Sequence, residues 1–299
     1  MQIQEIKQED VLFLDIETAP IFDDITSNED YFDSWKYKKQ RDADEKGLDI
    51  VEMYKRDAGL YPEFSRIVCI SIGLIESGRL MLKTFKGEES DILRDLMSFT
   101  SFNKKKRPLL NVGGYAVKTF DIPFIYKRCI VNQVKPVSIF DVGGLKPWEI
   151  LSVDLKEIWN GSSTSKASLL NVCISLGLES PKSDISGKDV ADVIKEEGGL
   201  DRVCRYCEKD VLSSVQVFNK LRFEKVITET VELEQAEDNG LIMRISIKGE
   251  ITEDLRAEIM EAKKGLSYQE KEAFIRMIRG ALAMSKQELD FSIELEILK

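Results

Sequence analysis

The chain has 299 residues, of which 43% are hydrophobic and 32% charged, and its formal net charge is -10. This length suffices for one large hydrophobic core and a smaller second domain, while the acidic balance argues against a nucleic-acid coat protein bound through a basic surface. The absence of histidine excludes a Ser-His-Asp triad, a Cys-His pair and an HExxH zinc site, so any catalysis has to use carboxylates, Tyr, Lys, Cys or a metal ion.

The start of the chain predicts a buried strand that ends in two carboxylates. The apolar run Val11 to Leu14 leads into Asp15-Ile16-Glu17-Thr18. Side chains alternate faces along a strand, so Asp15 and Glu17 point the same way. Neighbouring carboxylates repel each other and lose hydration, and this cost is offset by a bound cation or removed by protonation. The pair is therefore expected to form half of a metal site.

The segment from Asp23 to Glu63 is polar and aromatic and carries the basic run Lys36 to Arg41. It is too long for a hairpin connection, so it is expected to form helices or a lid. The basic run is expected to be a solvated surface, with contact to a nucleic-acid backbone as the alternative. After it, Arg66 to Glu76 and Leu80 to Phe85 predict two strands joined at Ser77-Gly78.

A helix, a strand and a second helix follow. Apolar residues at helical spacing predict a helix over Glu88 to Phe102, and the run Leu109 to Val112 predicts the fourth strand. Asp121-Ile122-Pro123 opens another amphipathic helix, since Pro is tolerated in the first turn. Asp121 thus lies at a strand-to-helix junction, where on its own it would be explained as a helix N-cap.

Asp201 to Leu221 has the clearest helical pattern of the chain, with one apolar stripe. Tyr206 and Asp210 are four residues apart and share a face beside this stripe, which on its own would indicate a solvated face. Cys204 and Cys207 have a CxxC spacing. Because the five cysteines are an odd number and no second CxxC is present, we expect reduced thiols in the core rather than a zinc site or a disulfide framework.

The last part of the chain has a different character. Met243 to Ile247 and Phe291 to Ile297 predict alternating strands, and the sequence between them predicts two amphipathic helices, the second with a capping box at Ser267 to Glu270. We therefore predict one domain over residues 1–225, with an insert at about 23–63, and an appended α+β module over 226–299. The mixed charge of this module suits a protein partner or self-association more than DNA binding.

The order Asp15-x-Glu17, Asp121, Tyr206-x-x-x-Asp210 resembles the DnaQ-like, or DEDD, 3′–5′ exonucleases, and among them the tyrosine subclass. The resemblance is strongest to predicted exonucleases related to the proofreading domain of family-B DNA polymerases. It implies an α/β fold with an RNase H-like mixed sheet flanked by helices. The shared stretches lie between about Val11 and Leu221 and are Phe13 to Thr18, Ile67 to Ser71, Phe120 to Phe124, Lys146 to Glu149 and Tyr206 to Val211.

The resemblance also implies a role for each residue of this set. Asp15, Glu17 and Asp210 would hold one Mg²⁺ or Mn²⁺ ion, and Asp15 and Asp121 would hold a second. Tyr206 and Glu17 would orient the attacking water. Because a tyrosine ordinarily titrates at about pH 10, Tyr206 is expected to position water by hydrogen bonding rather than to remove its proton.

The loop before Asp121 departs from the family pattern. Relatives usually have His-Asn a few residues ahead of Phe-Asp, whereas this chain has Tyr115-Ala116. No metal ligand is missing, but the substrate end is expected to be held differently. Tyr115 is expected either to stack on a base or to be buried against the sheet.

The sequence thus predicts a metal-dependent 3′–5′ exonuclease that hydrolyses terminal phosphodiester bonds of single-stranded or frayed DNA by a two-metal mechanism and releases nucleoside monophosphates. A 3′-end exoribonuclease of the same fold is one alternative, because the metal site alone does not recognise the sugar. A non-catalytic nucleic-acid-binding or partner subunit is another, against which the complete carboxylate set argues. No run approaches the roughly 20 apolar residues of a membrane span and no signal-peptide pattern is present, so we expect a cytoplasmic protein without membrane contact.

Overall fold

The computed structural model describes residues 3–163, 166–180, 185–232, 241–248 and 290–297. The chain divides into two units, residues 1–233 and residues 234–299. Within the described residues, no helix has both the length and the apolar character needed to cross a membrane.

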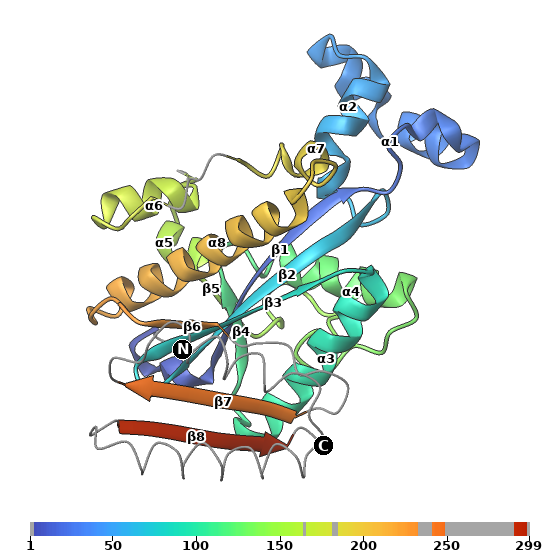
Figure 1. The fold of residues 1–299 in the computed structure, drawn as a ribbon. Coiled ribbons are helices and arrows are strands. Elements are labelled where there is room, and N and C mark those ends of the chain that lie inside the picture. Colours follow the sequence, from blue (N-terminus) through green and yellow to red (C-terminus); the bar gives the residue numbers. More distant parts are fainter. Residues whose placement is uncertain (1–2, 164–165, 181–184, 233–240, 249–289, 298–299) are drawn as a thin grey trace. The chain divides into compact units, whose positions relative to one another are not determined.

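One six-stranded mixed sheet forms the centre of the first unit, with the strand order β5-β4-β1-β2-β3-β6 (Figure 1). The hairpin predicted at Ser77-Gly78 is confirmed, and both residues have positive φ, as a tight two-residue turn requires. β1 pairs antiparallel with β2 and parallel with β4. The strands are β1 (Val11–Pro20), β2 (Ser65–Glu76), β3 (Arg79–Lys86), β4 (Asn111–Gly114), β5 (Ser152–Asp154) and β6 (Thr230–Glu232).

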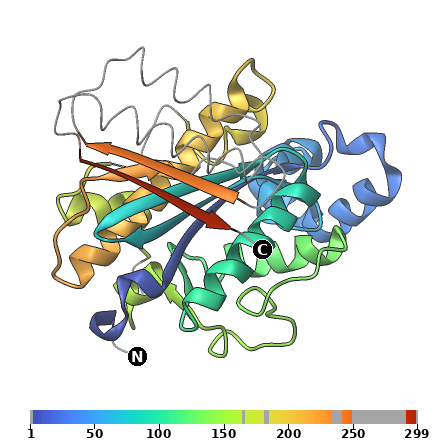
Figure 2. The same cartoon turned by 60° about the horizontal axis from the view of Figure 1, so that its bottom comes forward.

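Helices cover both faces of this sheet, which confirms the predicted α/β class with a mixed sheet flanked by helices. Figures 1 and 2 show α8 along one face and α3 with α4 on the other. The helices are α1 (Glu29–Lys46), α2 (Ile50–Asp57), α3 (Glu89–Lys106), α4 (Asp121–Val131), α5 (Leu155–Asn160), α6 (Leu169–Ser175), α7 (Val190–Val193) and α8 (Gly199–Leu221).

The alternation of β1 divides the core into two layers. Leu12, Leu14 and Ile16 pack with the apolar residues of α3 and α4, whereas Val11 and Phe13 pack with those of α8. All five side chains are at most 5% exposed. Asp15 and Glu17 continue the series of Val11 and Phe13, so the strand places both carboxylates on the α8 side.

The insert after β1 forms α1 and α2, which confirms the helices expected for this segment. These helices have a small core of their own around Trp35, whose indole N–H donates to the carbonyl of Ile50 at 3.1 Å. The basic run is largely used locally, since Lys39 pairs with Asp42 at 2.7 Å and its ammonium also lies over the ring of Tyr61. Contact of the other cations of this run with a nucleic-acid backbone stays a prediction.

Two boundaries differ from the sequence expectation. The fourth strand begins at Asn111, because Leu109 lies in a turn and is 71% exposed. The first unit continues to residue 233 rather than ending at 225, because β6 pairs parallel with β3 at the sheet edge. Ile227 is also fixed to α8, since its N–H donates to Gln216 Oε1 at 2.9 Å and its carbonyl accepts from Gln216 Nε2 at 2.6 Å.

In the second unit, β7 (Leu241–Lys248) and β8 (Asp290–Ile297) form an antiparallel pair. This confirms the two strands predicted over Met243 to Ile247 and Phe291 to Ile297. The two helices predicted between them lie outside the described residues.

Candidate active site

The first two carboxylates lie side by side in β1. Asp15 is paired with Ser71 and Glu17 with Cys69 in regular antiparallel register, and the register shifts only after Glu17. Asp15 is partly exposed, while Glu17 is 7% exposed. The thiol of Cys207 contacts both the Oδ2 atom and the carbonyl oxygen of Asp15 at 3.3 Å. Oxygen and sulfur atoms of Asp15, Glu17 and Cys207 all lie within 4.8 Å of one another.

Helix α8 places Tyr206 and Asp210 over this pair. Its buried stripe packs on the sheet through Cys207, Val211 and Phe218, and the ring of Phe218 meets Phe13 edge to face at 5.2 Å between centroids. Gly73 in β2 makes room for this helix, because a Cβ there would lie 2.9 Å from a methyl carbon of Val211. The stripe therefore fixes the rotation of α8 and directs Tyr206 and Asp210, both partly exposed, toward β1.

Asp121 reaches the same site from the other side of β1. It is the first residue of α4 and is 3% exposed. The N-cap is Phe120, so Asp121 is not the N-cap that its place in the sequence indicated; Asp121 Oδ1 accepts a hydrogen bond from the N–H of Ile16 at 3.2 Å. The side chain is thus fixed to the backbone between Asp15 and Glu17.

The other end of α4 is held by a buried ion pair. Arg128 donates through Nη2 and Nε to the carboxylate of Glu89 at 2.6 and 2.8 Å, and through Nη1 to the carbonyl of Pro62 at 2.9 Å. Glu89 also accepts from the N–H of Ile67 in β2 at 2.7 Å. α4 is therefore tied to the sheet at both ends, which fixes its position relative to β1.

Asp121 and Asp210 are close enough to Asp15 and Glu17 to raise the pKa values of both carboxyl groups. Burial, and then repulsion from neighbouring acidic groups, raises the pKa of Asp15 and of Glu17 well above the ordinary range. Burial raises the pKa of Asp121 to about 7 and that of Asp210 to about 6. Burial and then the charge of Asp210 raise the pKa of Tyr206 far above its ordinary value. The phenol thus keeps its proton and hydrogen-bonds to Asp210.

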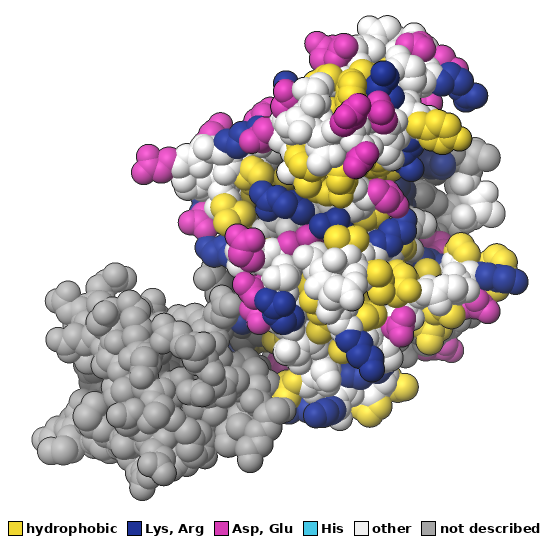
Figure 3. All heavy atoms as spheres, turned by 90° about the vertical axis from the view of Figure 1, so that its right-hand side faces the viewer, with side chains coloured by type: hydrophobic (Ala, Val, Ile, Leu, Met, Phe, Trp, Pro, Cys, Tyr) yellow, Lys and Arg dark blue, Asp and Glu magenta, His cyan; other side chains and the backbone are white. Residues whose placement is uncertain are grey.

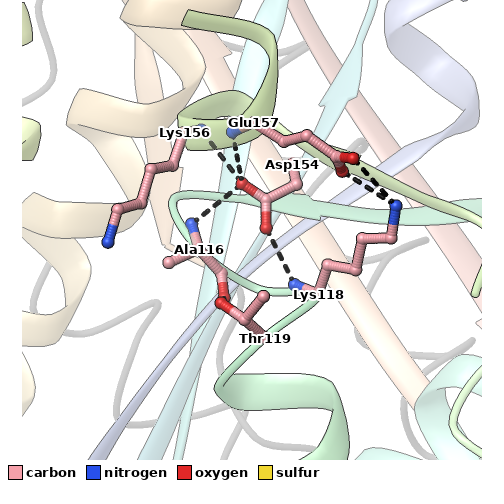
Figure 4. Close-up of polar contacts among 6 residues, drawn as sticks. All are labelled: Ala116, Lys118, Thr119, Asp154, Lys156 and Glu157. Atoms are coloured by element: carbon pink, nitrogen blue, oxygen red, sulfur yellow. Dashed lines mark hydrogen bonds and ion pairs between the residues drawn. The ribbon is translucent and has the colours of Figure 1, made fainter. Parts of the chain in front are cut away.

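A fifth carboxylate, Asp154, organises the loop that leads to Asp121 (Figure 4). It is 4% exposed and lies at the end of β5. Its Oδ1 atom accepts from the N–H groups of Lys156 and Glu157, both at 3.0 Å, and so caps α5. The same carboxylate accepts from the N–H of Lys118 at 3.0 Å and from that of Ala116 at 3.3 Å. Asp154 therefore joins α5 to the turn just before Asp121.

This turn contains strained backbone. Ala116 has φ +67°, a left-handed conformation that is unfavourable for a residue with a Cβ other than Asn or Asp. Gly114 permits the close approach of the turn to β1, because a Cβ at this position would lie 2.6 Å from the carbonyl oxygen of Leu14. The hydrogen bonds to Asp154 hold the turn in this conformation.

Tyr115, at the position where the sequence departs from the family pattern, is turned toward the core. Its hydroxyl donates to the carbonyl of Ala167 at 2.6 Å, and burial raises its pKa to about 12. Its ring packs against the cluster formed by β1 and α8. Of the two expectations for Tyr115, burial is the one that the structure favours.

Asp154 and Cys207 belong to the site but were not among the residues predicted for it. An Asp just before a helical pattern is a signal for an N-cap, and this signal was present at Asp154. Its bonds to Ala116 and Lys118 join segments that are far apart in the sequence, so no local pattern reports them. Cys207 was expected in the core, which is correct, but no local pattern indicated its contact with Asp15.

The donor set suits a hard divalent cation. Carboxylate oxygens are the ligands that Mg²⁺ and Mn²⁺ prefer. Among the described residues, none of the four carboxylates has a Lys or Arg ion-pair partner, so their repulsion is not relieved by the protein itself. A divalent metal ion therefore fits the carboxylates present here, which are those of Asp15, Glu17, Asp121 and Asp210.

Comparison with known proteins found one matching family. The model of a family described as predicted 3′–5′ exonucleases related to the exonuclease domain of PolB matches residues 60–259, more than half of the chain. The matched range includes Asp121, Tyr206 and Asp210 and begins after β1.

A solved structure that matches the chain is that of the family B DNA polymerase from the hyperthermophilic archaeon Pyrobaculum calidifontis, with 15% sequence identity and a TM-score of 0.42. The similarity covers 79% of this chain and 33% of the polymerase, so this chain spans about a third of that protein's length. Among curated proteins, none matches the sequence. On the family match, the chain belongs to the predicted 3′–5′ exonucleases related to the exonuclease domain of PolB.

Proposed function

We propose that the protein is a metal-dependent 3′–5′ exonuclease that acts on single-stranded or frayed DNA and releases nucleoside monophosphates. The observation that carries this proposal is the convergence of four carboxylates from β1, α4 and α8 around a partly exposed position without a compensating cation among the described residues. Such a cluster is stable when divalent ions occupy it and repels a phosphodiester when they do not.

The ligand roles proposed here are those that the family resemblance implies. Asp15, Glu17 and Asp210 would hold one Mg²⁺ or Mn²⁺ ion, and Asp15 and Asp121 would hold a second. When bound, such ions polarise the scissile phosphate and lower the pKa of a neighbouring water. The hydrogen bond to Ile16 and the ion pair of Arg128 would hold the carboxylate of Asp121 in position for the second ion before that ion binds.

Tyr206 would position the attacking water. Its pKa is raised, so its hydroxyl remains a hydrogen-bond donor and acceptor, and its bond to Asp210 fixes its direction. In the reaction, the water oxygen forms a bond to phosphorus, the bond from phosphorus to O3′ breaks, and O3′ leaves with a proton. Since the chain has no histidine, the proton released by the water passes to a carboxylate or to solvent.

The test is a degradation assay with DNA and RNA oligonucleotides of matched sequence, each labelled at the 5′ end, in Mg²⁺ or Mn²⁺. We expect the wild-type protein to shorten the labelled DNA one nucleotide at a time from the 3′ end, and a 3′-terminal phosphorothioate to slow this shortening. Asp15→Asn and Asp210→Asn should each lower the rate by at least roughly 10³-fold while the protein stays folded.

Asp201→Asn is the matched control, because Asp201 lies on the same helix but is exposed and pairs with Lys86. It should keep the wild-type rate. Full activity of Asp15→Asn, or no cleavage of either oligonucleotide with either metal, contradicts the proposal. If RNA is shortened faster than DNA, the substrate is RNA and the proposed DNA specificity is wrong.

A further inference from the structure

A cavity of about 480 Å³ lies away from the carboxylate cluster, between the second half of α3 and the segment that follows α4. Arg107, just after α3, donates to Glu76 at the end of β2, whereas Asp15 and Glu17 lie beside Ser71 and Cys69 in the middle of that strand. The end of α3 is therefore separated along β2 from the candidate active site, and no residue of that site lines the cavity. The cavity is lined by Thr100, Ser101, Lys104, Lys105, Lys135, Pro136, Val137, Ser138 and Ile139.

The charge of this cavity is entirely positive. Three lysines line it and no carboxylate does. Lys104 donates to the carbonyl of Leu110 at 2.9 Å, while Lys105 and Lys135 have no partner among the described residues. The local charge of this cavity is thus opposite in sign to the net charge of the chain, which is -10.

The helix dipole explains only part of this arrangement. Lys104 and Lys105 lie in the last turn of α3, where cations are favourable. Lys135 comes from a separate segment, which is fixed to α3 through the hydrogen bond from the N–H of Val137 to Met97 Sδ at 3.3 Å. Lys135 adds a third cation to the lining of the cavity. The mutual repulsion of these lysines is relieved when an anion binds between them.

The other residues that line the cavity, and its volume, indicate what kind of ligand it can hold. Ser101 and Ser138 supply hydroxyl groups beside the lysines, and the buried hydroxyl of Thr100 has no hydrogen-bond partner. Pro136, Val137 and Ile139 form an apolar wall that suits a flat ring. The volume lies within the range of small-molecule sites. Figure 3 shows the side of the unit that carries α3 and α4, where Lys and Arg side chains lie among hydrophobic ones.

We infer that this cavity binds a small phosphorylated ligand of mononucleotide size, with the phosphate at Lys105 and Lys135 and the organic part on the apolar wall. This site is separate from the candidate active site, and its existence does not depend on exonuclease activity. The same lysines could meet phosphate as a free monoester or as part of a nucleic-acid strand; the size of the cavity favours the free ligand.

The test measures binding to the full-length protein by isothermal titration calorimetry in EDTA, so that the metal-free carboxylates repel phosphate and leave the cavity as the anion site. The probes are inorganic phosphate, dAMP and a single-stranded oligonucleotide. We expect dAMP to bind more tightly than inorganic phosphate, and the Ile139 methyl signals to shift in NMR spectra. Lys105→Glu with Lys135→Glu should weaken dAMP binding at least tenfold.

The matched control is Lys188→Glu with Lys220→Glu, which makes the same change in net charge at exposed positions outside the cavity, one of them in the last turn of α8. It should change dAMP binding less than twofold. Equal loss in both double variants, no binding of dAMP at millimolar concentration, or binding of the oligonucleotide alone overturns the inference. Metal-dependent degradation assayed on the same variants reports separately on the proposed exonuclease.

Discussion

Tyr206 differs from the carboxylates around it because it keeps its proton and donates a hydrogen bond. Phe at this position removes one hydrogen bond to a charged group, worth about 1.5–3 kcal/mol. If this bond acts in the transition state, Tyr206→Phe should lower kcat roughly 10- to 100-fold and change KM for DNA less than about twofold. Steady-state kinetics on labelled DNA measure both values. Equal losses in binding and turnover would contradict the water-orienting role.

Asp121 and Asp210 should make the metal-free protein less stable at higher pH. Their pKa values are about 7 and about 6 in the folded chain, above the ordinary value of 3.8. The folded state therefore binds more protons than the unfolded state between about pH 4 and pH 7, and the stability gained from protonation is lost as pH rises through this window. Each kcal/mol lost lowers Tm by roughly 2–4 °C for a unit of this size.

Thermal unfolding in EDTA at pH 5 and pH 8 measures this effect. We expect a lower Tm at pH 8, a smaller difference in Asp121→Asn, and recovery of Tm at pH 8 when Mg²⁺ or Mn²⁺ is added. Asn keeps the acceptor for the N–H of Ile16, so the variant changes the charge and not the hydrogen bond. A Tm in EDTA that rises from pH 5 to pH 8 would show that ionisation of these carboxylates does not destabilise the fold.

At the scale of elements, the turn before α4 depends on Asp154. Asp154→Ala removes the acceptor of four backbone N–H groups, whereas Asp154→Asn keeps Oδ1 and loses the acceptor of Lys118 N–H. Because this turn positions Asp121, we expect the metal concentration for half-maximal exonuclease activity to rise roughly 10- to 100-fold in the Ala variant and less in the Asn variant.

Metal titrations of activity, compared with Tm, separate positioning from general stability. Asp189→Asn is the control, since Asp189 also accepts a backbone N–H, that of Ser186 at 2.8 Å, but lies in an exposed turn. It should leave the metal dependence unchanged. A lower Tm with unchanged metal dependence in Asp154→Ala would show that the residue only stabilises the fold.

The elements show which features could be predicted from the sequence. Strand alternation placed Asp15 and Glu17 on one face, and helical spacing placed Tyr206 and Asp210 together, because both patterns are local. The three-residue strand β6 has no such pattern; it forms because β3 offers an open edge.

The strained turn at Ala116 was also beyond the reach of sequence patterns. Its conformation depends on a carboxylate that follows 38 residues later. Contacts of this kind are decided by packing between distant segments, which a single sequence does not report.

At the scale of the whole molecule, the first unit should function without the second. All residues of the candidate site and the complete sheet lie within residues 1–233. A chain ending at residue 233 should therefore keep the Tm of this unit and, under the proposed function, its exonuclease activity. Circular dichroism and the degradation assay measure the two properties.

A chain ending at residue 225 provides the comparison. It lacks β6, the clamp between Ile227 and Gln216, and the contact of Val231 with the core. We expect a lower Tm and concentration-dependent aggregation through the open edge of β3. If the two truncated chains are equally stable and soluble, β6 is dispensable and the boundary expected at 225 is sufficient.

The pairing of β6 with β3 also bears on how the protein is made. On the ribosome, β3 emerges early, whereas the strand that covers its edge follows α8 and emerges long afterwards. A nascent chain therefore carries an uncovered strand edge while residues 87–229 are added, and neighbouring chains on one messenger RNA can pair through it. Slow translation between residues 87 and 229 lengthens this exposure, which makes codon choice in that stretch a determinant of soluble yield.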